Sequence, residues 1–276
     1  MQYRILAIDI DNTLLQGLTG VSKGNREALL RAEEAGCRVV LCTARGRYST
    51  RPVLAEFGPL SGPHIVFNGA ATFSRFDDHP DEVLVLDREL LREHGHAAAA
   101  IGVGLSGFED PRAGDRVYVD HPNEGLRQWS AANPERVVRV GSTEEVIERD
   151  LVALLCWGTE AQAHSVRDII GAPAAFSPPR VAPALQFGSY LLEVTAAGAT
   201  KGEALARLSR DLGIPRDAVI AVGDAEPDIG MIRFAGLGVA VENAKEDVRA
   251  AADYVAPPCS EDAVAHIVER FILGSG

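Results

Sequence analysis

Apolar residues in the first third of the chain occur in short runs separated by helical patterns. Residues 5–8 are apolar on both faces, as in a strand of a buried parallel sheet. Residues 38–42 and 64–67 are the second and third predicted strands. Residues 25–35 carry apolar positions at helical spacing and are expected to end at Gly36, and residues 47–57 predict a shorter helix. This order of strands and helices predicts a parallel sheet with helices on both faces.

The same alternation returns after about residue 196. The predicted helices there are residues 201–212, 227–234, 245–251 and 261–272. The predicted strands are residues 218–222 and 238–241. Together with the first third, these elements predict a Rossmann-like α/β core made of residues 1–81 and 196–276.

The middle of the chain has a different pattern. The strand candidates are residues 82–86, 102–105, 116–119, 137–140, 151–157, 185–187 and 190–194. The helix candidates are residues 88–100, 123–132 and 160–170, the last with Thr159 as its N-cap. This mixture predicts an inserted α+β cap domain with an antiparallel sheet, residues 82–195. Small residues at 196–198 suit a hinge, so we expect the cap to close over the core as a lid and to set substrate specificity.

Composition and charge exclude some classes of partner. Hydrophobic residues make up 46% of the chain and charged residues 24%, as in soluble globular proteins. The formal net charge of −12 argues against binding nucleic acid, which needs basic patches, but not against binding one small phosphate ester. No apolar run approaches the length of a membrane span, and the first residues show no signal-peptide pattern. We therefore expect a cytoplasmic protein with no membrane partner.

The most informative chemical signal is a pair of carboxylates directly after the first predicted strand. Asp9 and Asp11 stand two residues apart at the edge where open α/β sheets place their ligands. Close carboxylates repel each other and are stabilised by an oxygen-preferring cation such as Mg²⁺. An acidic turn after a strand gives the same short pattern, so the rest of the chain has to decide between the two interpretations.

Further candidates stand at the ends of other predicted elements. Thr43 follows the second strand and, with Ala44 and Arg45, offers hydroxyl and backbone donors for an anion, although an ordinary loop threonine fits as well. Lys201 stands at the first position of a helix that Thr200 is expected to cap. The helix dipole disfavours a cation at that position, which favours a functional role over a solvated lysine.

Two more aspartates follow the strand at residues 218–222. Asp224 comes directly after this strand, and Asp228 lies about one turn into the next helix, whose first turn suits Pro227. The structural alternative is an N-capping aspartate with a solvated partner. Carboxylates, a hydroxyl and a lysine at one sheet edge match the needs of phosphoryl transfer, which depends mostly on positioning and charge neutralisation.

These residues resemble the motifs of the haloacid dehalogenase (HAD) superfamily of aspartate-nucleophile phosphatases, and within it the Cof-type subfamily with a C2-type cap. The resemblance covers most of the predicted core. It is carried by residues 9–15, 43–45, 68–70, 199–202, 223–228 and 241–244. It implies a Mg²⁺-dependent phosphatase that acts on a small phosphorylated metabolite such as a sugar phosphate.

The resemblance also implies roles for individual residues. Asp9 would form an aspartyl-phosphate, and Asp11 would protonate the leaving alcohol and then activate water. The implied substrate- and phosphate-binding residues are Thr43, Ala44, Arg45, Asn68, Gly69 and Lys201. The implied metal-binding residues are Asp9, Asp11 through its backbone carbonyl, Asp224 and Asp228. Asn68 is expected to make a polar contact near the entrance, and Asp228 either supports the metal or orients Lys201.

Three positions depart from the family's pattern. Asn12, Ala44 and Pro227 stand where the family often has Gly, Gly and Asn, and none of them removes an essential carboxylate. Two other functions stay open: a phosphomutase on the same fold, and a non-catalytic ligand-binding or regulatory protein. Phosphate release without return to substrate separates the phosphomutase from a phosphatase, and the intact carboxylates argue against the non-catalytic protein. A dinucleotide-binding dehydrogenase is excluded because no G-x-G-x-x-G motif follows the first strand, and a P-loop enzyme is excluded because the chain has no G-x-x-x-x-G-K-[ST] motif.

Overall fold

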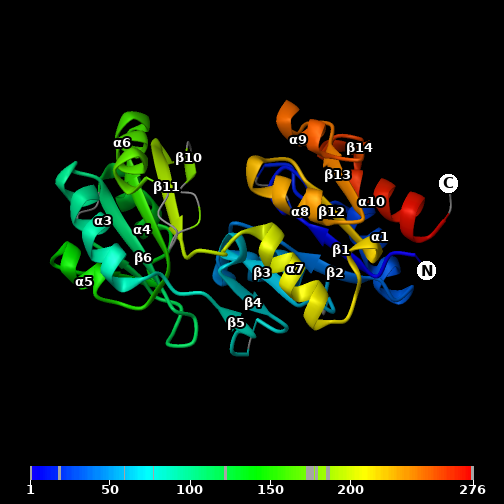
Figure 1. Ribbon diagram of the computed structural model, residues 1–276, viewed down its shortest axis with the longest axis horizontal. Coiled ribbons are helices and arrows are strands. Elements are labelled where there is room, and N and C mark those ends of the chain that lie inside the picture. Colours follow the sequence, from blue (N-terminus) through cyan, green and yellow to red (C-terminus); the bar gives the residue numbers. More distant parts are fainter. Residues whose placement is uncertain are drawn as a thin grey trace. The chain divides into compact units, whose positions relative to one another are not determined.

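The computed structural model of the chain describes residues 2–17, 20–58, 60–76, 78–120, 123–171, 177, 180–184 and 187–274 (Figure 1). The chain divides into two compact units. One is made of Met1–Glu82 and Thr200–Gly276, and the other of Val83–Ala199. The first unit is therefore assembled from both ends of the chain. The role of residues 82–195 as a lid stays a prediction.

A parallel sheet of five strands forms the centre of the first unit, in the order β14-β13-β12-β1-β2. The strands are β1 (Ile5–Ile8), β2 (Arg38–Leu41), β12 (Val219–Gly223), β13 (Leu237–Val241) and β14 (Tyr254–Ala256). This confirms the predicted parallel core and adds β14, a short strand whose Val255 is exposed and whose apolar pattern is therefore weak. Because β1 lies between β12 and β2, the carboxyl ends of these three strands meet at one edge.

Helices cover both faces of this sheet (Figure 1). Leu6 and Ile8 of β1 pack on one face with α1 (Lys23–Glu34) and α10 (Ala263–Ile267). Ile5 and Ala7 point to the other face and pack with α7 (Lys201–Asp211) and α8 (Ile229–Phe234). The remaining core helices are α2 (Arg47–Ala55) and α9 (Glu246–Ala251). Burial on both faces explains why these strands read as continuous apolar runs.

The third predicted strand does not continue the parallel sheet. As β3 (His64–Val66) it pairs antiparallel with β4 (Ala71–Phe73), in a separate sheet with β5 (Glu82–Val83). A single parallel bridge, between Cys42 and Ile65, links β3 to the end of β2. β3 therefore runs parallel to the end of β2, as predicted, but the prediction missed its main partner β4, which follows the chain reversal at the 3₁₀ turn Phe67–Gly69.

A six-stranded sheet forms the second unit, in the order β10-β11-β9-β6-β7-β8. Its strands are β6 (Gly104–Glu109), β7 (Val117–Val119), β8 (Val137–Arg139), β9 (Leu151–Gly158), β10 (Arg180–Ala184) and β11 (Ser189–Thr195). Packed on one face are α3 (Arg88–Ala100), α5 (Thr143–Ile147) and α6 (Glu160–Ile170). The predicted antiparallel arrangement is wrong for β7 and β8, which pair parallel because α4 (Glu124–Ala131) joins them as a crossover.

Some predicted boundaries differ from the structure. Of the strand predicted at 185–187, residues 185 and 186 lie outside the described residues. The strand that the structure describes just before it is β10 (Arg180–Ala184). The helix predicted at 227–234 begins as a 3₁₀ turn over Glu226–Asp228. The helix predicted at 261–272 divides into α10 and a π-helical turn at Val268–Ile272. Thr159 and Thr200 cap α6 and α7, as predicted.

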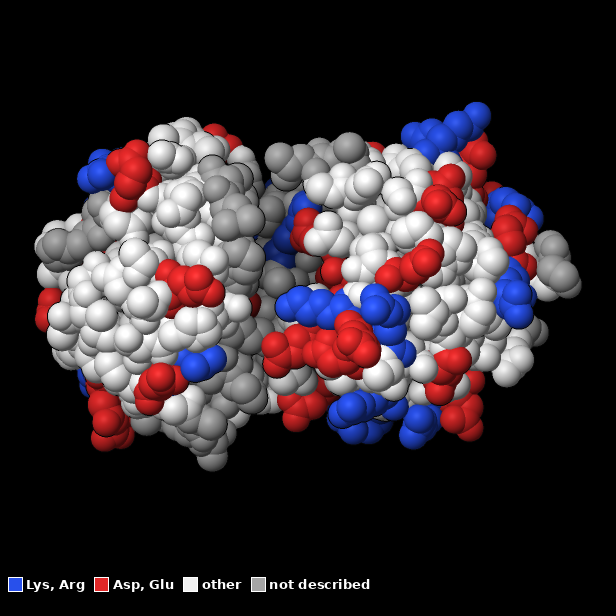
Figure 2. All heavy atoms as spheres, turned by 90° about the horizontal axis from the view of Figure 1, so that it is seen from above, with Lys and Arg blue, Asp and Glu red and all other residues white. Residues whose placement is uncertain are grey.

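None of the helices in the described part of the chain combines the length and the apolar character that a bilayer crossing requires. On the face drawn in Figure 2, Lys and Arg side chains lie close to Asp and Glu side chains. This mixture is consistent with the acidic net charge. It gives no support to a surface there that binds the phosphate backbone of a nucleic acid.

Candidate active site

Three adjacent parallel strands bring sequence-distant residues to one edge of the core sheet. Asp9 follows β1, Thr43 comes shortly after β2, and Asp224 follows β12. The Asp9 backbone N–H donates to the carbonyl of Val222 at 3.0 Å, which fixes the end of β1 against β12. The structure therefore brings these candidates together where the sequence predicted them.

A buried lysine connects two of the predicted carboxylates. Lys201 Nζ donates to Asp9 Oδ1 and to Asp228 Oδ1, each at 2.6 Å. The exposed fractions are 2% for Lys201, 6% for Asp9 and 0% for Asp228. Thr200 caps α7 by accepting the Glu203 N–H, so α7 begins at Lys201. Two close carboxylates outweigh the small penalty for a cation at a helix start.

The turn after β12 is folded around Asp228. Its Oδ2 accepts the backbone N–H groups of Asp224 at 3.1 Å and Ala225 at 3.0 Å. A Cβ on Gly223 would lie 2.3 Å from the Asp228 Cβ, so only glycine allows this approach. Thr13 Oγ1 donates to Asp224 Oδ1 at 3.0 Å and orients that carboxylate. Thr13 is a site residue that the sequence reasoning did not assign, although it belongs to the first motif.

Asp9, Asp224 and Asp228 form what we call the carboxylate cluster. Each offers a carboxylate oxygen, and these oxygens lie within 4.8 Å of one another. With Lys201 as the cation among them, the cluster keeps an excess of negative charge when its carboxylates are ionised. Oxygen donors with excess negative charge fit a hard divalent cation such as Mg²⁺.

Burial is the main cause of the pKa shifts in the cluster. It raises the pKa of Asp9 well above its usual value, against the opposing charge of Lys201. Burial and then the charge of Asp228 raise the pKa of Asp224 to about 6. Burial alone would lower the pKa of Lys201, but the charges of Asp228 and Asp9 outweigh it and raise this pKa. Lys201 is therefore protonated, and the carboxylates repel one another without a further cation.

Replacing Asp224 with Asn should stabilise the metal-free protein. The pKa of about 6 in the folded state exceeds the ordinary 3.8, so ionising Asp224 costs folding free energy as the pH rises from about 4 to 6. At pH 7 the free energy of unfolding of the variant should be about 1–2 kcal/mol higher than that of wild type. This value is discounted because solvent partly screens the charge of Asp224. Urea unfolding in EDTA at several pH values measures the difference. A variant less stable than wild type at pH 7 would contradict this account of the cluster.

Asp11 lies outside the carboxylate cluster and pairs with Arg45. Arg45 Nε donates to Asp11 Oδ2 at 2.9 Å and Nη2 donates to Oδ1 at 2.6 Å, a bidentate pair. The side chain of Asp11 is 50% exposed and that of Arg45 24%. The hydrogen bond with Asp11 is the main cause that raises the pKa of Arg45. Metal binding through the Asp11 backbone carbonyl stays a prediction.

The loop at residues 43–45 is folded on itself and held by the end of β3. The Arg45 N–H donates to Thr43 Oγ1 at 3.1 Å, and Thr43 is fully buried while Ala44 is exposed. The Asn68 and Phe67 N–H groups donate to the carbonyls of Thr43 at 3.0 Å and Arg45 at 2.9 Å. Phe67 was not predicted as a site residue, because only the pairing of β3 brings it to this loop.

Asn68 and Gly69 form a strained corner beside the start of α7. Phe67 and Asn68 have φ values of 50° and 53°, in the left-handed region that disfavours ordinary side chains. Gly69 has φ of 106°, and a Cβ there would lie 2.4 Å from the carbonyl oxygen of Thr200. The Asn68 side chain is buried, with 4% exposed. The corner thus supports the loop at residues 43–45 and the start of α7, and direct contacts of Asn68 and Gly69 with substrate stay predictions.

Two of the three departures from the resembled pattern fit the local backbone. Asn12 has φ of 57°, a conformation that suits the usual glycine and that asparagine tolerates. Its carbonyl accepts a hydrogen bond from Asn243 Nδ2 at 2.8 Å. This contact joins residues near opposite ends of the sequence and was not predicted. Pro227 lies in the first turn of the 3₁₀ segment before α8, where its missing N–H is tolerated.

Comparison with known proteins gives consistent likenesses over nearly the whole chain. The profile of the haloacid dehalogenase-like hydrolases matches residues 6–268. The chain is 29% identical to the 5-amino-6-(5-phospho-D-ribitylamino)uracil phosphatase YcsE of Bacillus subtilis, over 98% of this chain and 96% of that protein. It is 26% identical to the chloroplastic endoribonuclease YBEY of Arabidopsis thaliana, again over 98% of this chain, but it spans 47% of that longer protein.

Two solved structures show the same likeness. One is a haloacid dehalogenase-like hydrolase from Bacteroides thetaiotaomicron, with a TM-score of 0.81, 25% identity and coverage of 97% and 99% of the two chains. The other is a sugar phosphatase of HAD subclass IIB, with a TM-score of 0.81, 26% identity and coverage of 97% and 98%. The likeness therefore includes the inserted residues as well as the core.

Proposed function

This chain belongs to the haloacid dehalogenase-like hydrolases and is a phosphoric monoester hydrolase, and we propose that it releases phosphate from a small phosphorylated metabolite through an aspartyl-phosphate on Asp9. The observation that carries the proposal is the contact of Lys201 Nζ with Asp9 and Asp228, 2.6 Å from each. A buried ammonium beside a carboxylate at the open edge of a sheet can attract a phosphoryl group to that carboxylate. Neither a non-catalytic ligand-binding protein nor a regulatory one requires this arrangement.

The proposed reaction has two steps. In the first, an Asp9 carboxylate oxygen attacks phosphorus, the bond from phosphorus to the alcohol oxygen breaks, and Asp11 gives that oxygen a proton. In the second, Asp11 takes a proton from water, whose oxygen attacks the same phosphorus. The bond to Asp9 breaks, phosphate leaves, and both aspartates return to their starting forms.

The pair of Asp11 with Arg45 has to open during this cycle. A bidentate pair occupies both oxygens of Asp11, so Asp11 cannot donate a proton while the pair is intact. A phosphoryl group bound near Thr43 offers Arg45 an alternative anion with matching geometry. Exchange of Arg45 from Asp11 to the phosphoryl group would release Asp11 at the moment when substrate is present.

The carboxylate cluster would hold Mg²⁺ through Asp9 and Asp224, with Asp228 in support. A bound cation supplies charge neutralisation to the carboxylates and to the phosphoryl oxygens. The residues of the chain provide the rest. Lys201 holds a phosphoryl oxygen beside Asp9, and the hydroxyl of Thr43 and the backbone of loop 43–45 hold the others.

Turnover should depend on a divalent cation. We expect phosphate release from p-nitrophenyl phosphate to require Mg²⁺ and to stop when EDTA is added, because the cluster repels an anionic substrate when no cation is bound. Binding to the folded state alone should also raise the midpoint of thermal unfolding. The gain is about 2.7 kcal/mol at a Mg²⁺ concentration 100 times Kd. Full turnover of protein in EDTA would refute the metal proposal. It would not contradict the assignment of Asp9 as the nucleophile.

The substrate class is proposed from the relatives. One relative is named for a phosphorylated ribityl compound and one structural neighbour is named a sugar phosphatase. Both substrates carry hydroxylated carbon chains, so we propose a phosphate ester of a sugar or sugar alcohol. We further propose that residues 82–195 act as the cap that selects it. A panel of such esters, assayed for free phosphate with Mg²⁺, tests this. Isomerised ester without phosphate release would instead identify a phosphomutase.

A further inference from the structure

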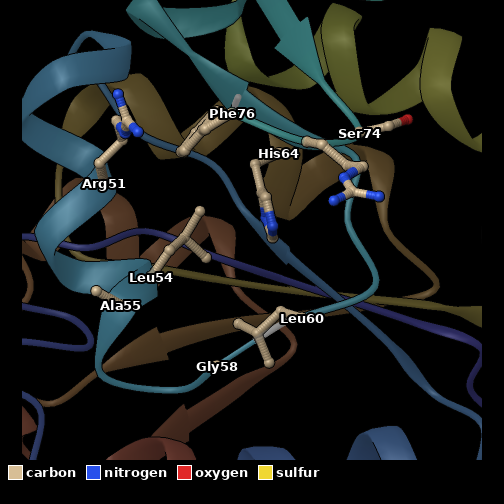
Figure 3. Close-up of a pocket in the computed structure, with 9 residues that line it drawn as sticks. Arg51, Leu54, Ala55, Gly58, Leu60, His64, Ser74 and Phe76 are labelled. Atoms are coloured by element: carbon tan, nitrogen blue, oxygen red, sulfur yellow. The ribbon is translucent and has the colours of Figure 1, made fainter. Parts of the chain in front are cut away.

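A pocket of about 350 Å³ lies in the first unit beside the start of β3 (Figure 3). Its walls include Arg51 and Leu54 from α2, His64 at the start of β3, and Phe76 after β4. No residue of the carboxylate cluster or of loop 43–45 lines it. The volume lies within the range of small-molecule sites, which is about 300–1,000 Å³.

His64 directs a hydrogen-bond donor at this pocket. The residue is 2% exposed, and its Nδ1 accepts the backbone N–H of Leu41 at 3.1 Å. Burial lowers the pKa of His64 to about 4, so at neutral pH the single ring hydrogen is on Nε2. Among the described residues no hydrogen bond to Nε2 is formed, but Nε2 is not one of the buried atoms that lack a partner, so it is open to the pocket. Because the ring lines the pocket in Figure 3, a ligand acceptor can replace water as the partner of this donor.

The other walls combine apolar surface with positive charge. The ring centroids of Phe76 and His64 lie 5.7 Å apart, with an angle of 53° between the ring planes. Leu54 and Leu60 add aliphatic surface. Arg51 and Arg75 bring two guanidinium groups to the same pocket. The pair of Arg75 with Asp78 is long, at 3.6 Å, with both side chains largely exposed, so a ligand anion can replace it at little cost.

We propose that this pocket is a second ligand site, separate from the active site, that binds a small organic anion with a flat apolar body. The anionic group contacts Arg51 and Arg75, the body packs on Phe76 and Leu60, and an acceptor atom takes the hydrogen of His64 Nε2. A guanidinium group donates paired hydrogen bonds to a carboxylate and to a phosphonate alike. The proposed ligand is therefore defined by its negative charge and its attached ring.

Calorimetric titration of the full chain with benzoate and with phenylphosphonate tests the proposal and separates the two anion types. At least one probe should bind in the millimolar range or more tightly. The double variant R51Q/R75Q should weaken that binding by about tenfold or more, which corresponds to about 1.4 kcal/mol. The double variant R210Q/R233Q removes the same charge from exposed arginines elsewhere in the unit and should leave binding unchanged.

Two further variants keep the result interpretable. Asp9→Asn should not affect binding, because the active site is not involved. Ala55→Trp places a large ring at an exposed position that lines the pocket, retains every charge, and should block the probe. The proposal is overturned if neither probe binds, if both arginine pairs have the same effect, or if Asp9→Asn removes binding while Ala55→Trp does not.

Discussion

Replacing Asp9 with Asn is expected to abolish turnover of phosphate esters, by on the order of 10⁴-fold or more, because the nucleophile is lost. Asn is nearly the same size and can still accept the hydrogen bond from Lys201 Nζ, so the fold should persist. Initial rates of phosphate release, with circular dichroism to verify folding, measure the effect. A variant that kept rates near those of wild type would show that Asp9 is not the nucleophile.

Asp11→Asn is the matched control for Asp9→Asn. It removes the proposed acid and base but leaves Asp9, and it loses the charged pair with Arg45 at a half-exposed position. With p-nitrophenyl phosphate, whose leaving group needs little protonation, the first step should proceed and the second should fail. Phosphorylated protein should therefore accumulate in Asp11→Asn and never in Asp9→Asn. Equal behaviour of the two variants would contradict the division of roles.

Replacing Lys201 with Met should damage both stability and activity. The change leaves Asp9 and Asp228 buried beside each other with no ammonium between them. Removing one partner of a buried ion pair costs about 3–5 kcal/mol, and loss of the phosphoryl contact should reduce kcat further. Urea unfolding measures the first effect and steady-state kinetics the second.

Two controls separate these effects. Lys23→Met removes an exposed lysine whose salt bridge with Glu27 is at the surface, and it should change stability by less than about 1 kcal/mol. The double variant K201M/D228N removes a buried carboxylate as well, and it should recover part of the lost stability but none of the activity. Recovery of activity in the double variant would mean that Lys201 acts only through Asp228.

The parallel core and the edge of the site were predictable because they depend on local patterns. Strands buried on both faces give continuous apolar runs, and in a parallel sheet every strand presents its carboxyl end at one edge. Asp9, Thr43 and Asp224 each follow such a run, so their meeting required no knowledge of distant contacts. The unfavourable position of Lys201 at a helix start was also readable, and the structure accounts for it with two carboxylates.

Other features were not predictable because they depend on which distant segments pair. The turn at Phe67–Gly69 makes β3 a hairpin strand, and this pairing alone brings Phe67 to loop 43–45. The parallel pairing of β7 with β8 likewise follows from the path of the chain through α4 rather than from either strand. The pair of Asp11 with Arg45 depends on side-chain geometry in a loop, where periodicity carries no information.

The most direct measurement of the central claim is peptide mass spectrometry of protein mixed with substrate and Mg²⁺ and then quenched in acid. In Asp11→Asn, where breakdown should be slow, the phosphoryl group is predicted on the peptide that contains Asp9, and none should be found in Asp9→Asn. A phosphoryl group on another residue, or rapid turnover with no phosphorylated peptide in any variant, would contradict an aspartyl-phosphate mechanism at Asp9.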